Sequence, residues 1–301
     1  MDPEGLALIT AANGLGGLRT KLHNTIQNAI LDEAACAGMR AFPGQVIDAE
    51  AALRLSNWQG PGVIAPEDEA NAPQRSQIRP DIILDFESTQ EIPFPDNEKP
   101  PNGTSMLFDV KTLGFLTTVY TARTLQEADR EVHNQEPAAV ASRARKVHGE
   151  YLGKARQRDG RFVHSEDEEG PFVGALKSYG VVQGLAVGVF GEMSRQVDVL
   201  VNHFARVSAR RAVASSGLRM SVNQHAAVFR SRIVRRLGSA AGRGVSQVML
   251  RIVSETASSA IDAGRSRGRR YYEHDVQVAL ERQFPRFHGG FAGPGPGEDA
   301  G

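Results

Sequence analysis

Residues 106–113 read MLFDVKTL, and this stretch decides how the fold is interpreted. Its length and its apolar residues predict a short buried strand. Because successive side chains of a strand point to opposite faces, Asp109 and Lys111 share one face with Leu107. A carboxylate and an ammonium group therefore project together from a strand that is otherwise apolar.

The stretch at 78–86, IRPDIILDF, predicts a second strand. It is rich in β-branched residues, and Pro80 stands near its start, where a missing amide donor is tolerated. Alternation places Asp81 and Asp85 on one face of this strand. If the two strands are neighbours, Asp81 and Asp109 converge on one cation, while Asp85 is a spare acid at the strand end.

These residue types suit phosphodiester hydrolysis. Mg²⁺ prefers hard oxygen ligands and keeps several waters, so two carboxylates and a backbone carbonyl form an adequate protein half of its shell. The reaction then needs a water made acidic by the metal and a cation that orients it and offsets phosphoryl charge. Lys111 is the candidate for that cation.

A helix is expected upstream, at 18–37, because Leu22, Ile26 and Ile30 recur at helical spacing. Glu33 falls on or beside the apolar face of this helix, where a carboxylate is costly unless it is paired or binds a metal. His23 lies at the border of the same face and is a candidate for a phosphate contact. The alternative is that Glu33 is solvated at the edge of the stripe and that His23 is a border histidine whose hydrogen bonds are satisfied within the fold.

The motif RPD at 79–81, followed by FDVK at 108–111, resembles the PD-(D/E)xK nuclease superfamily, which includes restriction-type endonucleases and nuclease domains of some mobile elements. The resemblance covers about residues 15–210. It implies an α/β fold with an αβββαβ core and a mixed central sheet. It also implies that Asp81 and Asp109 bind Mg²⁺ or Mn²⁺, that Lys111 assists the water, and that Glu33 is an outer metal ligand.

Three regions are expected along the chain. A nuclease-like domain at 1–212 includes an amphipathic helix at 138–158, a buried strand at 181–190 and a further helix at 192–209. A helical, arginine-rich region follows at 213–288. Residues 289–301, GGFAGPGPGEDAG, have the composition of a disordered tail.

The net charge of zero averages two unlike regions. Residues 195–270 hold fifteen arginines, no lysine and three acids, a net charge of +12, whereas residues 67–98 have a net charge of −7. Arginine suits phosphate oxygens, so this asymmetry predicts nucleic acid, expected to be DNA, as partner. The phosphate ligands expected beside His23 are Arg210, Arg211, Arg230, Arg232, Arg235 and Arg236.

Other classes of protein fit the sequence poorly. Cys36 is the single cysteine, so neither an internal disulfide nor a cysteine-based zinc site is expected within one chain. No apolar run of about 18 residues occurs, and the N-terminus lacks the basic segment of a signal peptide. We therefore expect a soluble protein that is not secreted and has no membrane partner.

Three functions remain open at this stage. The first is a Mg²⁺-dependent endonuclease. The second is a catalytically inactive protein of the same fold that binds nucleic acid or has a structural role, in which Asp81 caps a strand and Asp109 forms a salt bridge with Lys111. The third is an assembly protein whose C-terminal helices join subunits, so that a homo-oligomer is also compatible with the sequence.

Overall fold

The structure is a computed structural model, and it describes residues 18–56, 58, 77–87, 91–101, 103–113, 138–160, 162–163, 169–188, 191–216 and 221–266. The end of the expected arginine-rich region and the expected tail at 289–301 lie outside these residues. The chain divides into a compact unit Arg19–Val245 and a second unit formed by Met1–Leu18 and Ser246–Gly301. The expected domain boundary at residue 212 falls inside a helix of the first unit, and all contacts described below belong to that unit.

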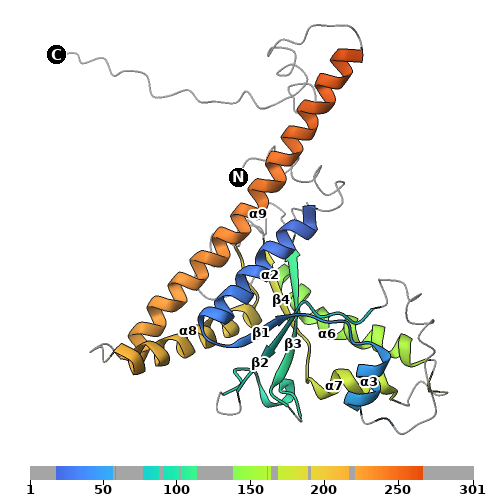
Figure 1. Cartoon of the computed structure of the whole chain (residues 1–301), viewed down its shortest axis with the longest axis vertical. Coiled ribbons are helices and arrows are strands. Elements are labelled where there is room, and N and C mark those ends of the chain that lie inside the picture. Colours follow the sequence, from blue (N-terminus) through green and yellow to red (C-terminus); the bar gives the residue numbers. More distant parts are fainter. Residues whose placement is uncertain are drawn as a thin grey trace. The chain divides into compact units, whose positions relative to one another are not determined.

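A four-stranded sheet forms the centre of this unit (Figure 1). The strands are β1 (Arg40–Pro43), β2 (Ile82–Asp85), β3 (Ser105–Leu113) and β4 (Gln183–Gly188), and they lie in that order. The β1–β2 and β2–β3 pairs are antiparallel, whereas β3 and β4 are parallel. The fold is therefore α/β with a mixed sheet, as expected from the sequence.

Four of the six α-helices in the described part of the chain follow the sequence expectation: α2 (Leu18–Cys36), α6 (Ala138–Asp159), α8 (Arg195–Ser216) and α9 (Val222–Ser266). The end of α2 is set by Gly38, whose φ of +74° is a left-handed conformation that glycine adopts at little cost. None of the described helices is long and apolar enough to span a membrane.

The sequence did not predict two short helices, α3 (Ala49–Ser56) and α7 (Pro171–Ser178). The start of α7 is capped from a distance, because the Asp159 carboxylate at the end of α6 accepts hydrogen bonds from the N–H groups of Phe172 and Val173, each at 2.8 Å. Those amides would otherwise lack partners in the first turn. No local sequence pattern reveals a cap supplied by another helix.

Helices lie on both sides of the sheet, with α3, α6 and α7 on one side and α2, α8 and the part of α9 up to Val245 on the other (Figure 1). On the first side, Leu107 of β3 is buried in a cluster with Val147 and Tyr151 of α6 and Phe172 of α7. Leu107 is two residues before Asp109, so the face that carries Asp109 is the one that α6 covers.

Candidate functional site

Asp81 and Asp109 are neighbours in the sheet, as expected from the two strand motifs. Asp81 directly precedes β2, and its N–H donates to the carbonyl of Phe108 at 3.0 Å. One of its carboxylate oxygens, Oδ2, accepts a hydrogen bond from the N–H of Val110 at 2.7 Å. Asp81 is thus bound to the peptide groups on both sides of Asp109, which fixes the two acids next to each other.

The backbone of Asp81 is also held by two residues from outside the β2–β3 pair. Its carbonyl oxygen accepts hydrogen bonds from the N–H of Gly44 at 2.8 Å and from Nε2 of Gln27 at 2.6 Å. A Cβ atom at Gly44 would lie 1.6 Å from the carbonyl oxygen of Pro80, so only glycine allows this close approach of the chain. Asp81 is therefore a rigidly positioned acid.

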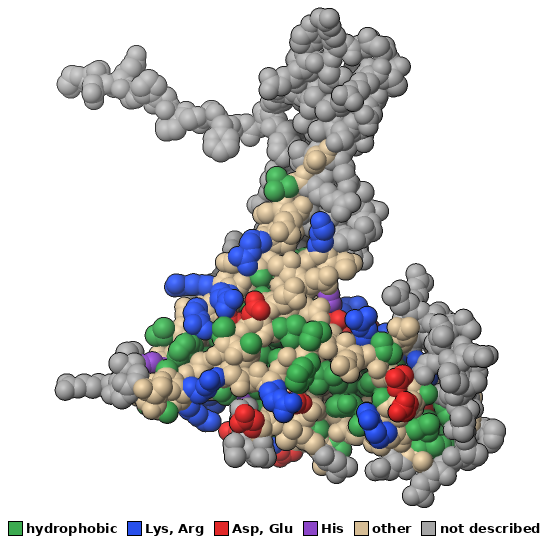
Figure 2. All heavy atoms as spheres, viewed as in Figure 1, with side chains coloured by type: hydrophobic (Ala, Val, Ile, Leu, Met, Phe, Trp, Pro, Cys, Tyr) green, Lys and Arg blue, Asp and Glu red, His purple; other side chains and the backbone are tan. Residues whose placement is uncertain are grey.

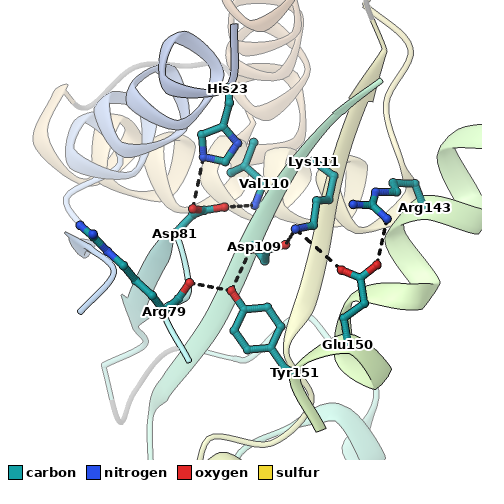
Figure 3. A network of polar contacts seen from close by, with 9 residues as sticks. All are labelled: His23, Arg79, Asp81, Asp109, Val110, Lys111, Arg143, Glu150 and Tyr151. Carbon is teal, nitrogen blue, oxygen red and sulfur yellow. Dashed lines mark hydrogen bonds and ion pairs between the residues drawn. The ribbon is translucent and has the colours of Figure 1, made fainter. Parts of the chain in front are cut away.

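Asp109 and Lys111 project from β3 into a polar network between β3 and α6 (Figure 3). Lys111 Nζ lies 2.6 Å from Oδ2 of Asp109 and 3.9 Å from a carboxylate oxygen of Glu150. The Tyr151 hydroxyl lies 2.8 Å from Oδ1 of Asp109 and 2.7 Å from the carbonyl oxygen of Arg79. Glu150 in turn is paired with Arg143 at 2.8 Å.

The two acids of this network differ in their affinity for protons. Burial raises the pKa of Asp109, and the nearby charge of Asp81 adds to that effect, although Lys111 and Tyr151 oppose it. Burial also acts against ionisation of Asp81, but His23, the Val110 N–H and Asp109 outweigh it and lower the pKa of Asp81. Asp81 is thus held ionised beside Asp109, which retains its proton to higher pH. Two carboxylates that share a site commonly have pKa values that differ in this way.

His23 belongs to the same cluster. Its Nε2 lies 3.2 Å from Oδ1 of Asp81, and the ring projects from the first half of α2 toward that carboxylate (Figure 3). Burial acts to lower the pKa of His23, but the hydrogen bond and charge of Asp81 outweigh it and raise that pKa. The sequence placed His23 at the border of the helix face, and its observed partner is an acid of the site.

Glu33 lies elsewhere. It is ten residues beyond His23 on α2, which corresponds to about 15 Å along the helix axis. Its side chain is 1% exposed, and its carboxylate faces the guanidinium groups of Arg236 and Arg232, the latter at 3.5 Å. The structure therefore brings Glu33 together with α9 and not with Asp81 and Asp109.

Three network members were missed at the level of sequence. Tyr151 occurs on the apolar stripe of α6, where its ring is 2% exposed and indistinguishable by pattern from a core residue. Glu150 stands on the charged side of the same helix, and Gln27 is one of several polar residues in α2. What these three residues share is their position close to Asp81 and Asp109. The sequence does not reveal that position, because it depends on how α2 and α6 pack on the sheet.

The six expected phosphate-binding arginines fall into two groups. Arg230 is paired with Asp198 at 2.7 Å, and both Arg232 and Arg236 are paired with Glu33. The remaining three have no acidic partner among the described residues: Arg210, Arg211 and Arg235. In the view of Figure 2, basic side chains are spread along the region of α8 and α9.

A groove of about 870 Å³ follows α9 and is lined by Ala227, Val228, Ser231, Arg232, Arg235, Arg236, Ser239 and Arg243. Its four arginines recur at three-, four- and seven-residue steps and so share one side of the helix. This surface contains half of the six arginines that were expected to bind phosphate.

Asp81 and Asp109 form a pair of carboxylates and not a complete set of metal ligands. Within the described ranges, no group of three or more histidine, cysteine or acidic side chains is arranged to hold a metal ion. Comparison with known proteins adds no assignment: no family model matches the sequence, and neither a curated protein nor a solved structure matches the chain.

Proposed function

We propose that this protein is a metal-dependent endonuclease that hydrolyses phosphodiester bonds of DNA, with a site of the PD-(D/E)xK type. The observation that carries the proposal is the placement of Asp81 against both peptide groups that flank Asp109, with Lys111 two residues further along the same strand. If α3 and α7 are set aside, the order of elements from α2 to β4 is helix, three strands, helix, strand. That order agrees with the resemblance in the motifs.

The two carboxylates retain capacity for a Mg²⁺ or Mn²⁺ ion. Oδ2 of Asp81 accepts from the Val110 N–H and Oδ1 lies 3.2 Å from His23, and each carboxylate oxygen has two lone pairs. Oδ2 of Asp109 is buried and lies 2.6 Å from the ammonium group of Lys111. A bound divalent cation would acidify a water and offset charge on the phosphoryl oxygens, and Mg²⁺ takes most of its other ligands from water.

Lys111 is placed for two tasks within this proposal. Its ammonium group neutralises Asp109 while the cation is absent, and it is 23% exposed, so it can turn toward a phosphate oxygen or the attacking water. Glu150, 3.9 Å away on α6, limits how far the ammonium group moves. Lys111 therefore orients the nucleophile, and Glu150 positions Lys111.

The α9 groove supplies the second part of the proposal, contact with the DNA backbone. Arg235 and Arg243 line it and have no acidic partner among the described residues, so their charge is available to phosphates. Arginine contacts of this kind hold nucleic acid without reading its sequence. The proposal therefore predicts strong, salt-sensitive binding with little base preference from this surface.

The test is cleavage of supercoiled plasmid with Mg²⁺ or Mn²⁺ by the full chain. Asp109→Asn and Lys111→Ala are expected to lose at least 100-fold in rate, the usual order for removal of a group that assists the chemistry. The matched control is Asp85→Asn. Asp85 is on the same face of the strand as Asp81, but its hydrogen-bond partner is Ser105, which is not part of the proposed site. Equal rates for wild type, Asp109→Asn and Lys111→Ala would refute the proposal.

One observation favours a second candidate, a catalytically inactive nuclease-fold protein that binds nucleic acid. Both acids already have partners within the chain, His23 for Asp81 and Lys111 for Asp109. If these ion pairs are structural, millimolar Mn²⁺ will not raise the melting temperature, whereas a metal site stabilises the native state by binding it selectively. DNA binding without metal-induced stabilisation and without cleavage would favour this second candidate.

A further inference from the structure

A second polar pocket lies on α8, away from Asp81 and Asp109. Its volume is about 370 Å³, and it is lined by Glu91, Pro93, Val199, Asn202, His203, Arg206, Val207 and Arg210. The ring of His203 packs against Phe86, with 5.4 Å between ring centroids. Phe86 follows the end of β2 opposite to Asp81, about 16 Å along the strand from it. The pocket is therefore separate from the proposed nuclease site.

The α8 side of the pocket is one continuous helix face. Val199, His203, Arg206, Val207 and Arg210 are spaced by steps of four, three, one and three residues, which places them together on the helix surface. A face used only for packing would carry apolar residues at these positions. Here two valines alternate with an imidazole and two guanidinium groups, and Glu91 and Pro93 also line the pocket.

No described residue forms an ion pair that neutralises the charge of this pocket. Neither Arg206 nor Arg210 has an acidic ion-pair partner in the described part of the chain, in contrast to Arg230 and Arg236, which do. Glu91 lines the pocket but is an exposed side chain and forms no ion pair with either arginine among the described contacts. Two planar guanidinium groups one helical turn apart thus face the same space.

His203 adds a neutral polar wall. Its Nε2 is buried and has no hydrogen-bond partner among the described residues. Burial lowers the pKa of His203 to about 4, with Arg210 and Arg206 acting in the same direction and Glu91 opposing them. At neutral pH the ring is therefore uncharged, and the positive charge of the pocket comes from the two arginines.

We propose that the α8 pocket binds a phosphate group, either inorganic phosphate or the phosphate monoester of a small molecule, between Arg206 and Arg210. Guanidinium groups match the geometry of phosphate oxygens, and a phosphate carries about −1.5 to −2 charges at neutral pH, close to the charge of two arginines. One N–H of the Asn202 amide donates to Asp198 at 3.0 Å and the second N–H is available to the ligand, while Val199, Val207 and Pro93 supply an apolar wall for the rest of an ester. Whether the Asp81 and Asp109 cluster cleaves DNA has no bearing on this site.

The test is calorimetric titration of the full chain with inorganic phosphate at pH 7 and constant ionic strength, in parallel with adenosine monophosphate as a phosphate monoester. One site is expected, with at least a tenfold loss of affinity in Arg206→Ala and in Arg210→Ala. Glu91→Gln is expected to strengthen binding severalfold, because it removes the acid found among the described residues that line the pocket. The matched control is Arg54→Ala, an exposed arginine of α3 outside the α8 pocket and the α9 groove, which should bind phosphate as the wild type does.

Nuclear magnetic resonance of the His203 ring locates the site independently. Phosphate is expected to shift the His203 signals and to raise the pKa of that ring, because a nearby anion favours the imidazolium form. Tighter binding of adenosine monophosphate than of inorganic phosphate would identify an ester as the natural ligand, and equal binding would identify the free anion. Absence of saturable binding, or binding that Arg206→Ala and Arg210→Ala leave unchanged, would overturn the proposal.

Discussion

The N–H of Val110 donates a hydrogen bond to Oδ2 of Asp81 at 2.7 Å. The side chain of Asp81, which directly precedes β2, thus accepts a hydrogen bond that a backbone carbonyl would normally accept from β3. The same carboxylate contacts His23 through its other oxygen. Asp81 therefore has a structural role in addition to the proposed metal contact, and the two roles are separable by substitution.

Asp81→Asn keeps a side-chain oxygen for the Val110 N–H, whereas Asp81→Ala leaves that N–H without a partner. An unsatisfied, largely buried amide costs about 1–3 kcal/mol. We expect Asp81→Ala to lower the free energy of unfolding by about that amount and Asp81→Asn by clearly less, while both lose metal-dependent stabilisation. Urea denaturation with and without Mn²⁺ measures both effects. Equal stability of the two variants would show that the hydrogen bond has no structural weight.

Tyr151→Phe removes the hydroxyl that lies between Asp109 and the carbonyl of Arg79. Because the hydrogen bond from Tyr151 acts to lower the pKa of Asp109, its loss should raise that pKa further above the usual range. An acid must lose its proton to bind a metal, so the pH midpoint for stabilisation by Mn²⁺ should move upward. Melting temperatures with and without Mn²⁺ between pH 5 and 8 measure the midpoint. A midpoint that stays where it is in the wild type would argue against Asp109 as a ligand.

The strand motifs predicted the positions of Asp81, Asp109 and Lys111 in the sheet because their information is local. In MLFDVKTL, alternation alone places Asp109 and Lys111 on one face, and IRPDIILDF places Asp81 at the start of a second strand, whose pairing with the first is given by the structure. The sheet is mixed, and Gly38 lies just beyond the end of α2 at Cys36, as expected. These features depend on periodicity and on single residues with a defined conformation.

Features that depend on packing between distant segments were not predictable in the same way. Glu33 was correctly identified as an inward acid, but its partner Arg236 lies about 200 residues further along the chain. The sequence of α2 does not tell whether a metal ion or a guanidinium group compensates the buried charge of Glu33. Tyr151 and the start of α7 illustrate the same point, since each is defined by a contact with a remote residue.

The ion pair between Glu33 and Arg236 gives an asymmetric prediction. Glu33 is 1% exposed and Arg236 is 45% exposed, so removal of the arginine leaves a buried charge, whereas removal of the acid leaves a cation that water can solvate. Arg232 is a second, more distant partner at 3.5 Å. Arg232→Ala combined with Arg236→Ala should destabilise the protein by about 3–5 kcal/mol, the range for an uncompensated buried charge.

Glu33→Gln should cost less than that double substitution, because it removes the buried charge itself. Urea denaturation of the three proteins measures the difference, and Asp32→Asn serves as the control, since Asp32 is an exposed neighbour 3.8 Å from Arg236. A Glu33→Gln variant at least as unstable as the double arginine variant would contradict this interpretation of the pair.

The α9 groove gives a prediction on nucleic-acid binding. Arg235→Ala combined with Arg243→Ala should weaken binding of DNA and reduce the slope of log affinity against log salt concentration by about 2, close to one unit for each phosphate that is no longer neutralised. The control is Arg230→Ala on the same helix, because Arg230 is already paired with Asp198. Fluorescence anisotropy at four salt concentrations measures the slopes. An unchanged slope in the double variant would remove the groove from the interface.

His203 should make stability depend on pH in a defined window. Its pKa in the folded protein is about 4, chiefly because the ring is buried, whereas in the unfolded chain it is close to the ordinary value of 6.5. Between these two values the unfolded state binds the additional proton, so stability rises with pH through this window and is lost as pH falls from 6.5 toward 4. The expected contribution is of order 2 kcal/mol.

The difference between wild type and His203→Gln isolates this contribution, because all other titrating groups are common to both proteins. His23, whose pKa is raised, titrates with the opposite sign but cancels in the difference. Urea denaturation at pH 7 and at pH 4.5 should therefore show a steeper loss of stability in the wild type than in the variant. Addition of phosphate should reduce that loss, since a bound anion lets the folded protein accept the proton on His203. Equal pH dependence in the two proteins would mean that His203 is solvated in the folded state, and the α8 pocket would then lack its neutral wall.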